Sequence, residues 1–201
     1  MSTLVFDTET TGLPRWNHPS ADPDQPHLVQ IAMLLLADDG TETQSNCLII
    51  RPDGWTIPPE MTAIHGISQE QAMDEGVPET EAVALFVFRQ GQASLRVAHN
   101  EAFDRRVLRI AMTRAGLARD FIEAIEARAS YCTCNNAKAI VNLPPTLRML
   151  DSGRKGPKPP KLEECCRFFF GHEFVGAHDA LNDARMCARV WQALTRRSAT
   201  A

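Results

Sequence analysis

Four carboxylates and one histidine stand where a folded chain rarely places a charge or a polar group. They are Asp7, Glu9, Asp104, His178 and Asp183. Asp7 and Glu9 lie in an apolar stretch that ends at a glycine, and its period of two places both carboxylates on one face of a predicted strand. Two anions on one side of a buried strand end indicate a site for metal ions.

The other two acids fall in helical patterns. Apolar residues follow Asp104 at i+3, i+4 and i+7, and they follow Asp183 at i+4, i+7 and i+11. These spacings place each aspartate on the inward face of its helix, with Asp104 near the helix N-terminus. The sequence therefore predicts that a strand pair and two helix carboxylates face the interior.

Buried carboxylates must be protonated, paired with a cation or given to a metal. No lysine or arginine accompanies these acids on the predicted inward faces. Oxygen ligands of this kind suit two Mg²⁺ or Mn²⁺ ions, roughly 4 Å apart, which clamp a phosphodiester for attack by water. His178, five residues before Asp183 and at the start of the same predicted helix, is our candidate general base, because imidazole titrates near neutrality.

The elements that would position these residues indicate one α/β domain over residues 1–201. We expect a three-strand meander with the first strand central, then a helix, a short strand and a helix that starts at Glu101. The middle of the chain is mainly helical, with a possible short strand near residues 130–131. The predicted strands are 4–9, 29–37, 46–51 and 95–98, the clearest helices are 80–90, 162–170 and 179–194, and residues 195–201 form a frayed tail.

Two long segments carry no apolar pattern. Residues 13–27 are rich in Pro, Asp and His, and we expect a mobile loop beside the site. Residues 143–160 form a loop rich in Pro, Gly and Lys. Its basic residues could contact nucleic acid although the chain has a net charge of −4, but a solvated loop is the commoner outcome.

The N-terminus shows no signal-peptide pattern, and the longest apolar run is far too short to span a bilayer. We expect a cytoplasmic protein with reduced cysteines. The six cysteines lack the paired C-x-x-C spacing of a zinc site and are expected to pack in the core. A metal site formed by residues 132, 134, 165 and 166 is the less favoured alternative.

Three segments of the chain resemble the exonuclease motifs of the DEDDh family, which includes the epsilon subunit of bacterial DNA polymerase III, ribonuclease T and oligoribonuclease. The segments are residues 6–13, 97–104 and 178–184. The resemblance implies a ribonuclease H-like fold with a mixed five-stranded sheet flanked by helices. It also implies that Asp7, Glu9 and Asp183 hold the ion that activates water. Asp7 would share the second ion, Asp104 would support it through water, and His178 would be the base.

The resemblance also suggests contacts to substrate. Thr8 and Thr10 are candidates at the 3′-hydroxyl, while His65 and Asn100 are candidates near the terminal nucleotide. By themselves the remaining polar residues favour simpler roles. We expect a structural hydrogen-bonding role for His99, an N-cap for Asp179, and solvation for His18 and His27.

These observations predict a metal-dependent 3′-to-5′ exonuclease that releases nucleoside 5′-monophosphates from single-stranded or frayed DNA, with a DNA polymerase or replication protein as a possible partner. Two alternatives remain open: an exoribonuclease of the same family, and a nucleic-acid-binding subunit without catalysis. The complete set of Asp7, Glu9, Asp104, His178 and Asp183 argues against the second alternative.

Overall fold

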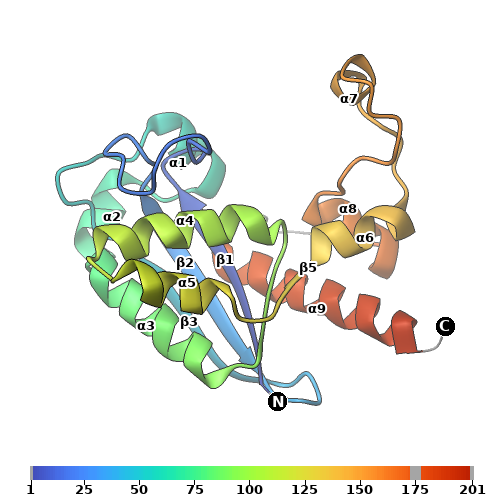
Figure 1. Ribbon diagram of the computed structural model, residues 1–201, viewed down its shortest axis with the longest axis horizontal. Coiled ribbons are helices and arrows are strands. Elements are labelled where there is room, and N and C mark those ends of the chain that lie inside the picture. The colour runs from blue at the N-terminus through green and yellow to red at the C-terminus, as the bar shows by residue number, and fades with distance from the viewer. Residues whose placement is uncertain (1, 173–177, 200–201) are drawn as a thin grey trace.

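The computed structural model describes residues 2–172 and 178–199, and at its centre is a five-stranded sheet (Figure 1). The strand order is β3-β2-β1-β4-β5. β1, β2 and β3 form an antiparallel meander, while β4 and β5 continue the sheet parallel to β1. The predicted mixed sheet with a central first strand is confirmed. The strands are β1 (Thr3–Thr10), β2 (Leu28–Leu36), β3 (Glu42–Ile49), β4 (Leu95–Ala98) and β5 (Ser130–Cys132).

Helices cover the sheet on both faces. α3, α4 and α5 lie in front of the sheet in Figure 1, and α9 packs on the opposite face with α6 and α8 against it. No helix among the described residues has the length and apolar character needed to cross a membrane. The helices are α1 (Pro59–His65), α2 (Gln69–Glu75), α3 (Glu79–Gln92), α4 (Glu101–Arg114), α5 (Arg119–Glu126), α6 (Thr133–Val141), α7 (Leu147–Asp151), α8 (Leu162–Phe170) and α9 (Ala180–Ala199).

The central strand is buried on both faces because its side chains alternate between two cores. Leu4 and Phe6 pack with residues of α3 and α4, whereas Val5 packs against α9. β2, which is apolar over almost its whole length, is buried throughout. A strand between two helical layers needs apolar residues in both directions, and this explains why the first two strands read as nearly continuous apolar runs.

Several boundaries differ from the prediction. β3 begins at Glu42 rather than near residue 46, because its first half is exposed at the sheet edge and carries no apolar pattern. α9 continues to Ala199, so residues 195–199 are helical rather than frayed, and residues 200–201 lie outside the described part of the chain. α7 falls inside a segment predicted to be a loop.

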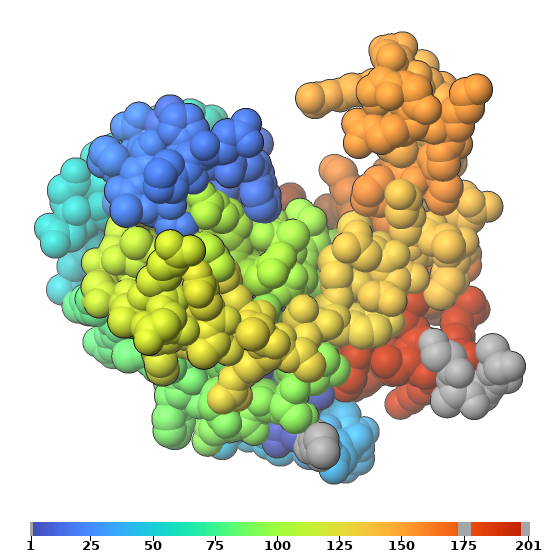
Figure 2. Space-filling view, in the orientation of Figure 1, coloured from blue at the N-terminus to red at the C-terminus, as the bar shows by residue number. Residues whose placement is uncertain are grey.

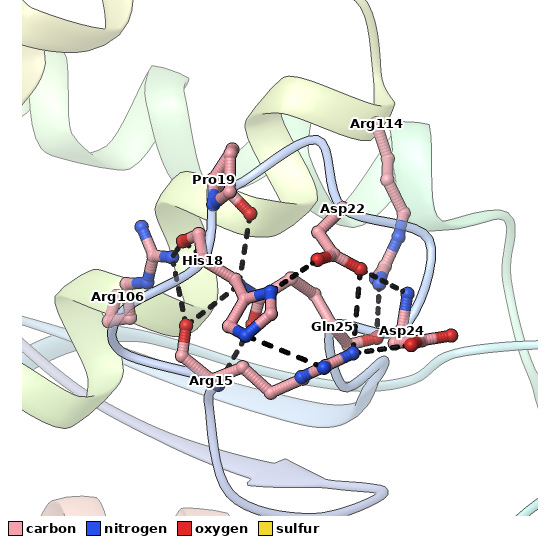
Figure 3. Close-up of polar contacts among 8 residues, drawn as sticks. All are labelled: Arg15, His18, Pro19, Asp22, Asp24, Gln25, Arg106 and Arg114. Carbon is pink, nitrogen blue, oxygen red and sulfur yellow. Dashed lines mark hydrogen bonds and ion pairs between the residues drawn. The ribbon is translucent and has the colours of Figure 1, made fainter.

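Loop 13–27, for which we predict mobility, is joined by hydrogen bonds to one buried side chain and to α4 (Figure 3). Gln25 is 2% exposed. Its amide nitrogen donates to the carbonyl oxygens of Arg15, His18 and Pro19 at 3.0–3.3 Å, and its amide oxygen accepts from the N–H of Arg15 at 3.0 Å. One buried side chain thereby satisfies four backbone groups of the loop.

Two arginines of α4 attach the loop to the body of the protein. Arg106 donates to the hydroxyl of Ser20 at 2.8 Å, and Arg114 donates to the carbonyl oxygens of Gln25 and Pro26 at 2.6 and 3.0 Å. At the end of the loop, the ring of His27 stacks on Trp55 with centroids 4.5 Å apart. The prediction that His27 is merely solvated is therefore wrong.

The second long segment, residues 143–160, stands away from the body, and together with Lys161 it is called the arm (residues 143–161) below. In Figure 2 it forms the orange projection beyond α6 and α8. At its base the N–H of Lys158 donates to the carbonyl oxygen of Leu143 at 3.1 Å. α7 lies near its tip, and nearly all of residues 146–156 are exposed.

The cysteines mostly pack in the interior, as predicted. Cys134, Cys165, Cys166 and Cys187 are buried, and none of the six forms a disulfide. Within residues 2–172 and 178–199, no group of three or more potential metal ligands includes a cysteine. The alternative of a cysteine metal site gains no support.

Candidate active site

Asp7 and Glu9 lie in the second half of β1, on the face that packs against α9. Val5, two residues earlier, is buried against that helix, and the period of two carries both carboxylates to the same side. Glu9 pairs with Gln30 of β2. The Gln30 side chain accepts a hydrogen bond from the N–H of Ala180 at 3.2 Å. The first residue of α9 is thereby fixed beside the strand that carries both acids.

The start of α9 places Asp183 and His178. Asp179 caps the helix, because its Oδ1 accepts from the N–H of Asn182 at 2.9 Å, as predicted. His178 lies two residues before the helix rather than at its start. It has a left-handed backbone with φ of 66°, and its N–H donates to Oδ2 of Asp183 at 3.1 Å. This bond turns the His178 backbone towards Asp183.

Asp104 approaches β1 from the other side, on the first turn of α4. Asn100 precedes this helix in a left-handed conformation with φ of 66°, and its side chain makes no capping hydrogen bond. Asp104 is 2% exposed. Its Oδ1 accepts from both the N–H and the hydroxyl of Thr8, at 3.1 and 2.8 Å. Thr8 therefore fixes the orientation of this carboxylate.

A buried arginine lies close to this region but serves a different acid. Arg96 is 2% exposed, and its Nε donates to Oε1 of Glu101 at 3.1 Å. Its other nitrogens donate to the carbonyl oxygens of Ile125 and Glu126 at 2.9 and 3.0 Å. The ion pair anchors the first turn of α4 to β4 and α5. Asp104, one turn further along the helix, receives no cation from it.

Asp7, Glu9, Asp104 and Asp183, called the acidic centre below, all have pKa values above their ordinary values. Burial, followed by repulsion from the other three acids, raises the pKa of Asp7 well above its ordinary value. Burial and repulsion raise the pKa of Glu9 to about 8. Burial raises the pKa of Asp104 to about 7 against the opposing hydrogen bonds from Thr8, and it raises the pKa of Asp183 to about 6. Among residues 2–172 and 178–199, no lysine or arginine forms an ion pair with these four acids.

A divalent cation would fit this environment. Glu9, His178 and Asp183 each offer one ligand atom, and these three atoms lie within 4.8 Å of one another. Oδ1 of Asp183 is buried and has no hydrogen-bond partner among the described residues. An uncompensated acceptor among hard oxygen donors is the arrangement that Mg²⁺ or Mn²⁺ satisfies.

A cleft of about 510 Å³ opens beside these residues. His178 and Asp183 line it, together with Asn100, Pro160 and Glu163 from the start of α4, the base of the arm and the start of α8. In Figure 2 a gap separates the arm from the lobe that contains loop 13–27. The sequence reasoning missed Pro160 and Glu163, because neither belongs to a periodic pattern or to one of the three motifs.

His99 has the structural role that the sequence predicted. Its Nε2 bonds to the carbonyl oxygen of Pro160 at 3.0 Å, and its Nδ1 lies 2.9 Å from the hydroxyl of Thr133. Burial lowers the pKa of His99, so the ring is neutral. Nε2–H then donates to the carbonyl, and Nδ1 accepts from the hydroxyl.

The candidate substrate contacts differ in what their side chains offer. The hydroxyl of Thr8 is engaged by Asp104, and that of Thr10 donates to the carbonyl oxygen of Gly12 at 2.7 Å. Asn100 lines the cleft. Nδ1 of His65 accepts from the N–H of Ile67 at 3.1 Å, whereas its Nε2 is buried with no partner among the described residues. Asn100 and His65 therefore retain hydrogen-bonding groups that a ligand could use.

The sequence profile of the RNase_T exonuclease family matches residues 4–191. The chain belongs to this exonuclease family. The family consists of 3′-to-5′ exonucleases of the DEDDh type, which use divalent metal ions. The predicted family is thus confirmed. No protein in the curated set matches the sequence.

Solved structures of exonuclease I share the fold. Escherichia coli exonuclease I in complex with a dA16 oligonucleotide is 19% identical, with a TM-score of 0.75, and the match covers 99% of this chain and 42% of that one. A zinc-bound complex of the same enzyme with single-stranded DNA is 18% identical, with a TM-score of 0.75, over 98% and 41%. A moderately thermophilic exonuclease I from Methylocaldum szegediense is 22% identical, with a TM-score of 0.72, over 98% and 41%.

The chain thus spans about two fifths of the length of these solved structures. Their likeness supports the ribonuclease H-like architecture predicted from the motifs.

Proposed function

We propose that this protein hydrolyses phosphodiester bonds at the 3′ ends of single-stranded or frayed DNA and releases nucleoside 5′-monophosphates. The observation that carries the proposal is the convergence of the acidic centre with His178 at the edge of one cleft. These residues lie on β1, on α4 and at the start of α9, so the fold brings together side chains that are far apart in the sequence.

The donor set supports two divalent ions, Mg²⁺ or Mn²⁺. Asp7, Glu9 and Asp183 would hold one ion, Asp7 would share the other, and Asp104 would support it through water. When bound, such ions lower the pKa of a water molecule and offset the charge on the phosphate and on the departing oxygen.

The remaining chemistry falls to the chain itself. His178 takes the proton of the attacking water as the new oxygen–phosphorus bond forms. The bond from phosphorus to the 3′ oxygen of the penultimate nucleotide breaks, and this oxygen leaves with the bonding electron pair. Thr8 holds Asp104 in place through its two hydrogen bonds. His65 and Asn100 would contact the terminal nucleotide. The side-chain hydroxyls of Thr8 and Thr10 already donate to Asp104 and to the carbonyl oxygen of Gly12, so towards the 3′-hydroxyl they would act as acceptors.

DNA is our preferred substrate because the solved exonuclease I complexes contain single-stranded DNA and dA16 oligonucleotides. The 2′-hydroxyl is the group by which a protein tells RNA from DNA, and the acidic centre contains no evident reader for it. A polymerase partner stays a prediction.

The test is digestion of 5′-labelled DNA and RNA strands of the same sequence, with and without Mg²⁺ or Mn²⁺. We expect a metal-dependent ladder that shortens from the 3′ end, with mononucleotide products and faster cleavage of DNA. Clear preference for RNA would overturn the choice of substrate. Intact strands under every metal condition would favour the non-catalytic alternative.

Single substitutions test whether the activity depends on the acidic centre and His178. Asp183→Asn should lower turnover by at least about 10³-fold, and His178→Ala by about 10² to 10⁴-fold, the range for a lost general base. Asp179→Asn is the matched control, since asparagine also caps helices well and Asp179 serves as the cap of α9. Full activity of Asp183→Asn, or equal losses in Asp183→Asn and Asp179→Asn, would contradict the assignment.

A further inference from the structure

The arm concentrates positive charge in a protein that is otherwise strongly acidic. Residues 143–161 contain five lysines and arginines against one acid, Asp151, which gives a net charge of +4. The whole chain carries −4, so the remaining residues carry −8. The five basic residues are Arg148, Arg154, Lys155, Lys158 and Lys161. Such a separation creates a local positive field that an anionic ligand would feel despite the net charge.

The basic residues divide into two groups. Lys158 pairs with Glu164 of α8, with Nζ 2.7 Å from Oε2, and this pair helps to fix the base of the arm. Towards the tip, Arg148, Arg154 and Lys155 are exposed, and within residues 2–172 and 178–199 none of the three forms an ion pair. Their charges are therefore available to a ligand.

The tip also exposes apolar surface. Leu147 is 80% exposed and Leu150 is 47% exposed. They lie three residues apart on α7, a spacing that puts them on the same side of a helix. Single-stranded nucleic acid binds to surfaces that combine cations for its phosphates with aromatic side chains on which its bases stack. The tip of the arm has the cations and, in place of aromatic rings, two exposed leucines that offer apolar contact to bases.

The base of the arm is continuous with the cleft. Pro159, Pro160 and Lys161 line the cleft together with His178 and Asp183. The carbonyl oxygen of Pro160 accepts from the ring of His99, and the thiol of Cys134 donates to it at 3.4 Å. A strand whose 3′ end lies at the acidic centre can therefore leave the cleft along the arm.

We propose that the arm binds the single-stranded part of the substrate on the 5′ side of the scissile bond. Arg148, Arg154 and Lys155 contact its phosphates, while Leu147 and Leu150 contact its bases. The inference rests on the proposed function, because it takes the 3′ end to lie in the cleft. An acidic protein partner is the competing occupant, and the continuity of the arm with the cleft favours the polynucleotide.

The experiment compares two double variants. Arg154→Gln with Lys155→Gln removes charge from the arm. Arg51→Gln with Arg119→Gln removes the same charge from exposed positions outside the arm and the cleft. Kinetics are measured on a dinucleotide and on an oligothymidylate of about 20 nucleotides, at several salt concentrations. Thermal unfolding checks that each variant is folded.

For the arm variant we expect the KM for the long strand to rise about tenfold, with kcat little changed. The slope of log affinity against log salt should fall by about 1.4, at about 0.7 for each lost phosphate contact. Cleavage of the dinucleotide should change less than about twofold, since it is too short to reach the arm. The control variant should resemble the parent. Equal effects on both substrates, or equal effects of both double variants, would overturn the proposal.

A binding assay tests this inference independently of the proposed catalytic function. A fluorescent oligothymidylate is titrated into the Asp183→Asn protein with and without the two arm substitutions. Weaker binding caused by the arm substitutions supports the arm even if the parent protein proves inactive. Leu147→Ser with Leu150→Ser should also weaken this binding. Unchanged binding in both arm variants would rule out the polynucleotide as the occupant and leave the acidic protein.

Discussion

Loop 13–27 and the arm resemble each other in sequence and differ in structure. Both are long, rich in proline and polar residues, and without apolar periodicity. Loop 13–27 is fixed by the buried amide of Gln25 and by arginines of α4. In the described part of the chain, the hydrogen bonds that join the arm to the body lie near its base, and the arm projects into solvent (Figures 1 and 2).

The two segments differ in which groups form hydrogen bonds with their backbone. In loop 13–27 three carbonyl oxygens turn inward to the side chain of Gln25. Arg106 donates to two of these carbonyls as well, and Arg114 donates to two further ones. Polar backbone can lie against the body of a protein only when such partners exist. The arm keeps most of its backbone in water, and its charged side chains stay available.

The largest effect that separates the two segments should come from Gln25→Ala. The substitution leaves the N–H of Arg15 without its buried partner, which costs roughly 1–3 kcal/mol unless water enters. It also removes one of the hydrogen bonds to each of three carbonyl oxygens, which keep bonds from Arg106 or from N–H groups of the loop. We expect the free energy of unfolding to fall by about 3 kcal/mol in urea denaturation. Gln44→Ala, at an exposed position of β3, is the control and should have a small effect. A loss below about 0.5 kcal/mol for Gln25→Ala would show that the loop is not held as described.

A smaller effect should follow from His27 at the end of the loop. Burial, and then the charge of Arg114, lowers its pKa from 6.5 to about 4. The unfolded chain therefore takes up a proton between these values while the folded protein does not, and this group makes stability fall as the pH drops from 6.5 to 4. Because His27 is only half-buried, we expect a contribution on the order of 1 kcal/mol.

Urea denaturation at pH 7 and pH 4.5, for the parent protein and for His27→Gln, measures this contribution. The variant should lose less stability on acidification than the parent. Residues 143–161 contain no histidine, so a protein with a shortened arm should retain the parental pH dependence. The same loss in His27→Gln as in the parent would mean that solvent reaches the His27 ring freely.

The smallest effect should come from removing the arm itself. Replacing residues 144–157 with four glycine and serine residues keeps the Leu143–Lys158 hydrogen bond within reach and removes mainly exposed surface. The free energy of unfolding should stay within about 1 kcal/mol of the parent value. A loss of several kcal/mol would mean that the arm supports the fold, and it would remove the contrast with loop 13–27.

The sequence was most informative where a short pattern decides the outcome. The alternation in β1 placed Asp7 and Glu9 on one face, and helical spacing placed Asp104 and Asp183 inward. The structure agrees with both placements. The central position of β1 followed from the meander, and Asp179 was recognised as a cap from its place before the last helix.

Contacts between distant segments could not be predicted in this way. The stacking of His27 on Trp55 joins residues far apart in the chain, and nothing local to His27 indicates it. Pro160 and Glu163 reach the cleft only because the arm folds back at its base. α7 was missed because its five residues are too few to display a helical period.

The neutral ring of His99 has a consequence for how the cleft behaves. It links the end of β4 to Thr133 at the start of α6 and to Pro160 at the base of the arm. The wall of the cleft is thus braced to the central sheet. If the arm bends when a strand binds, we expect the bend to lie beyond this brace, so that the opening next to the acidic centre keeps its width.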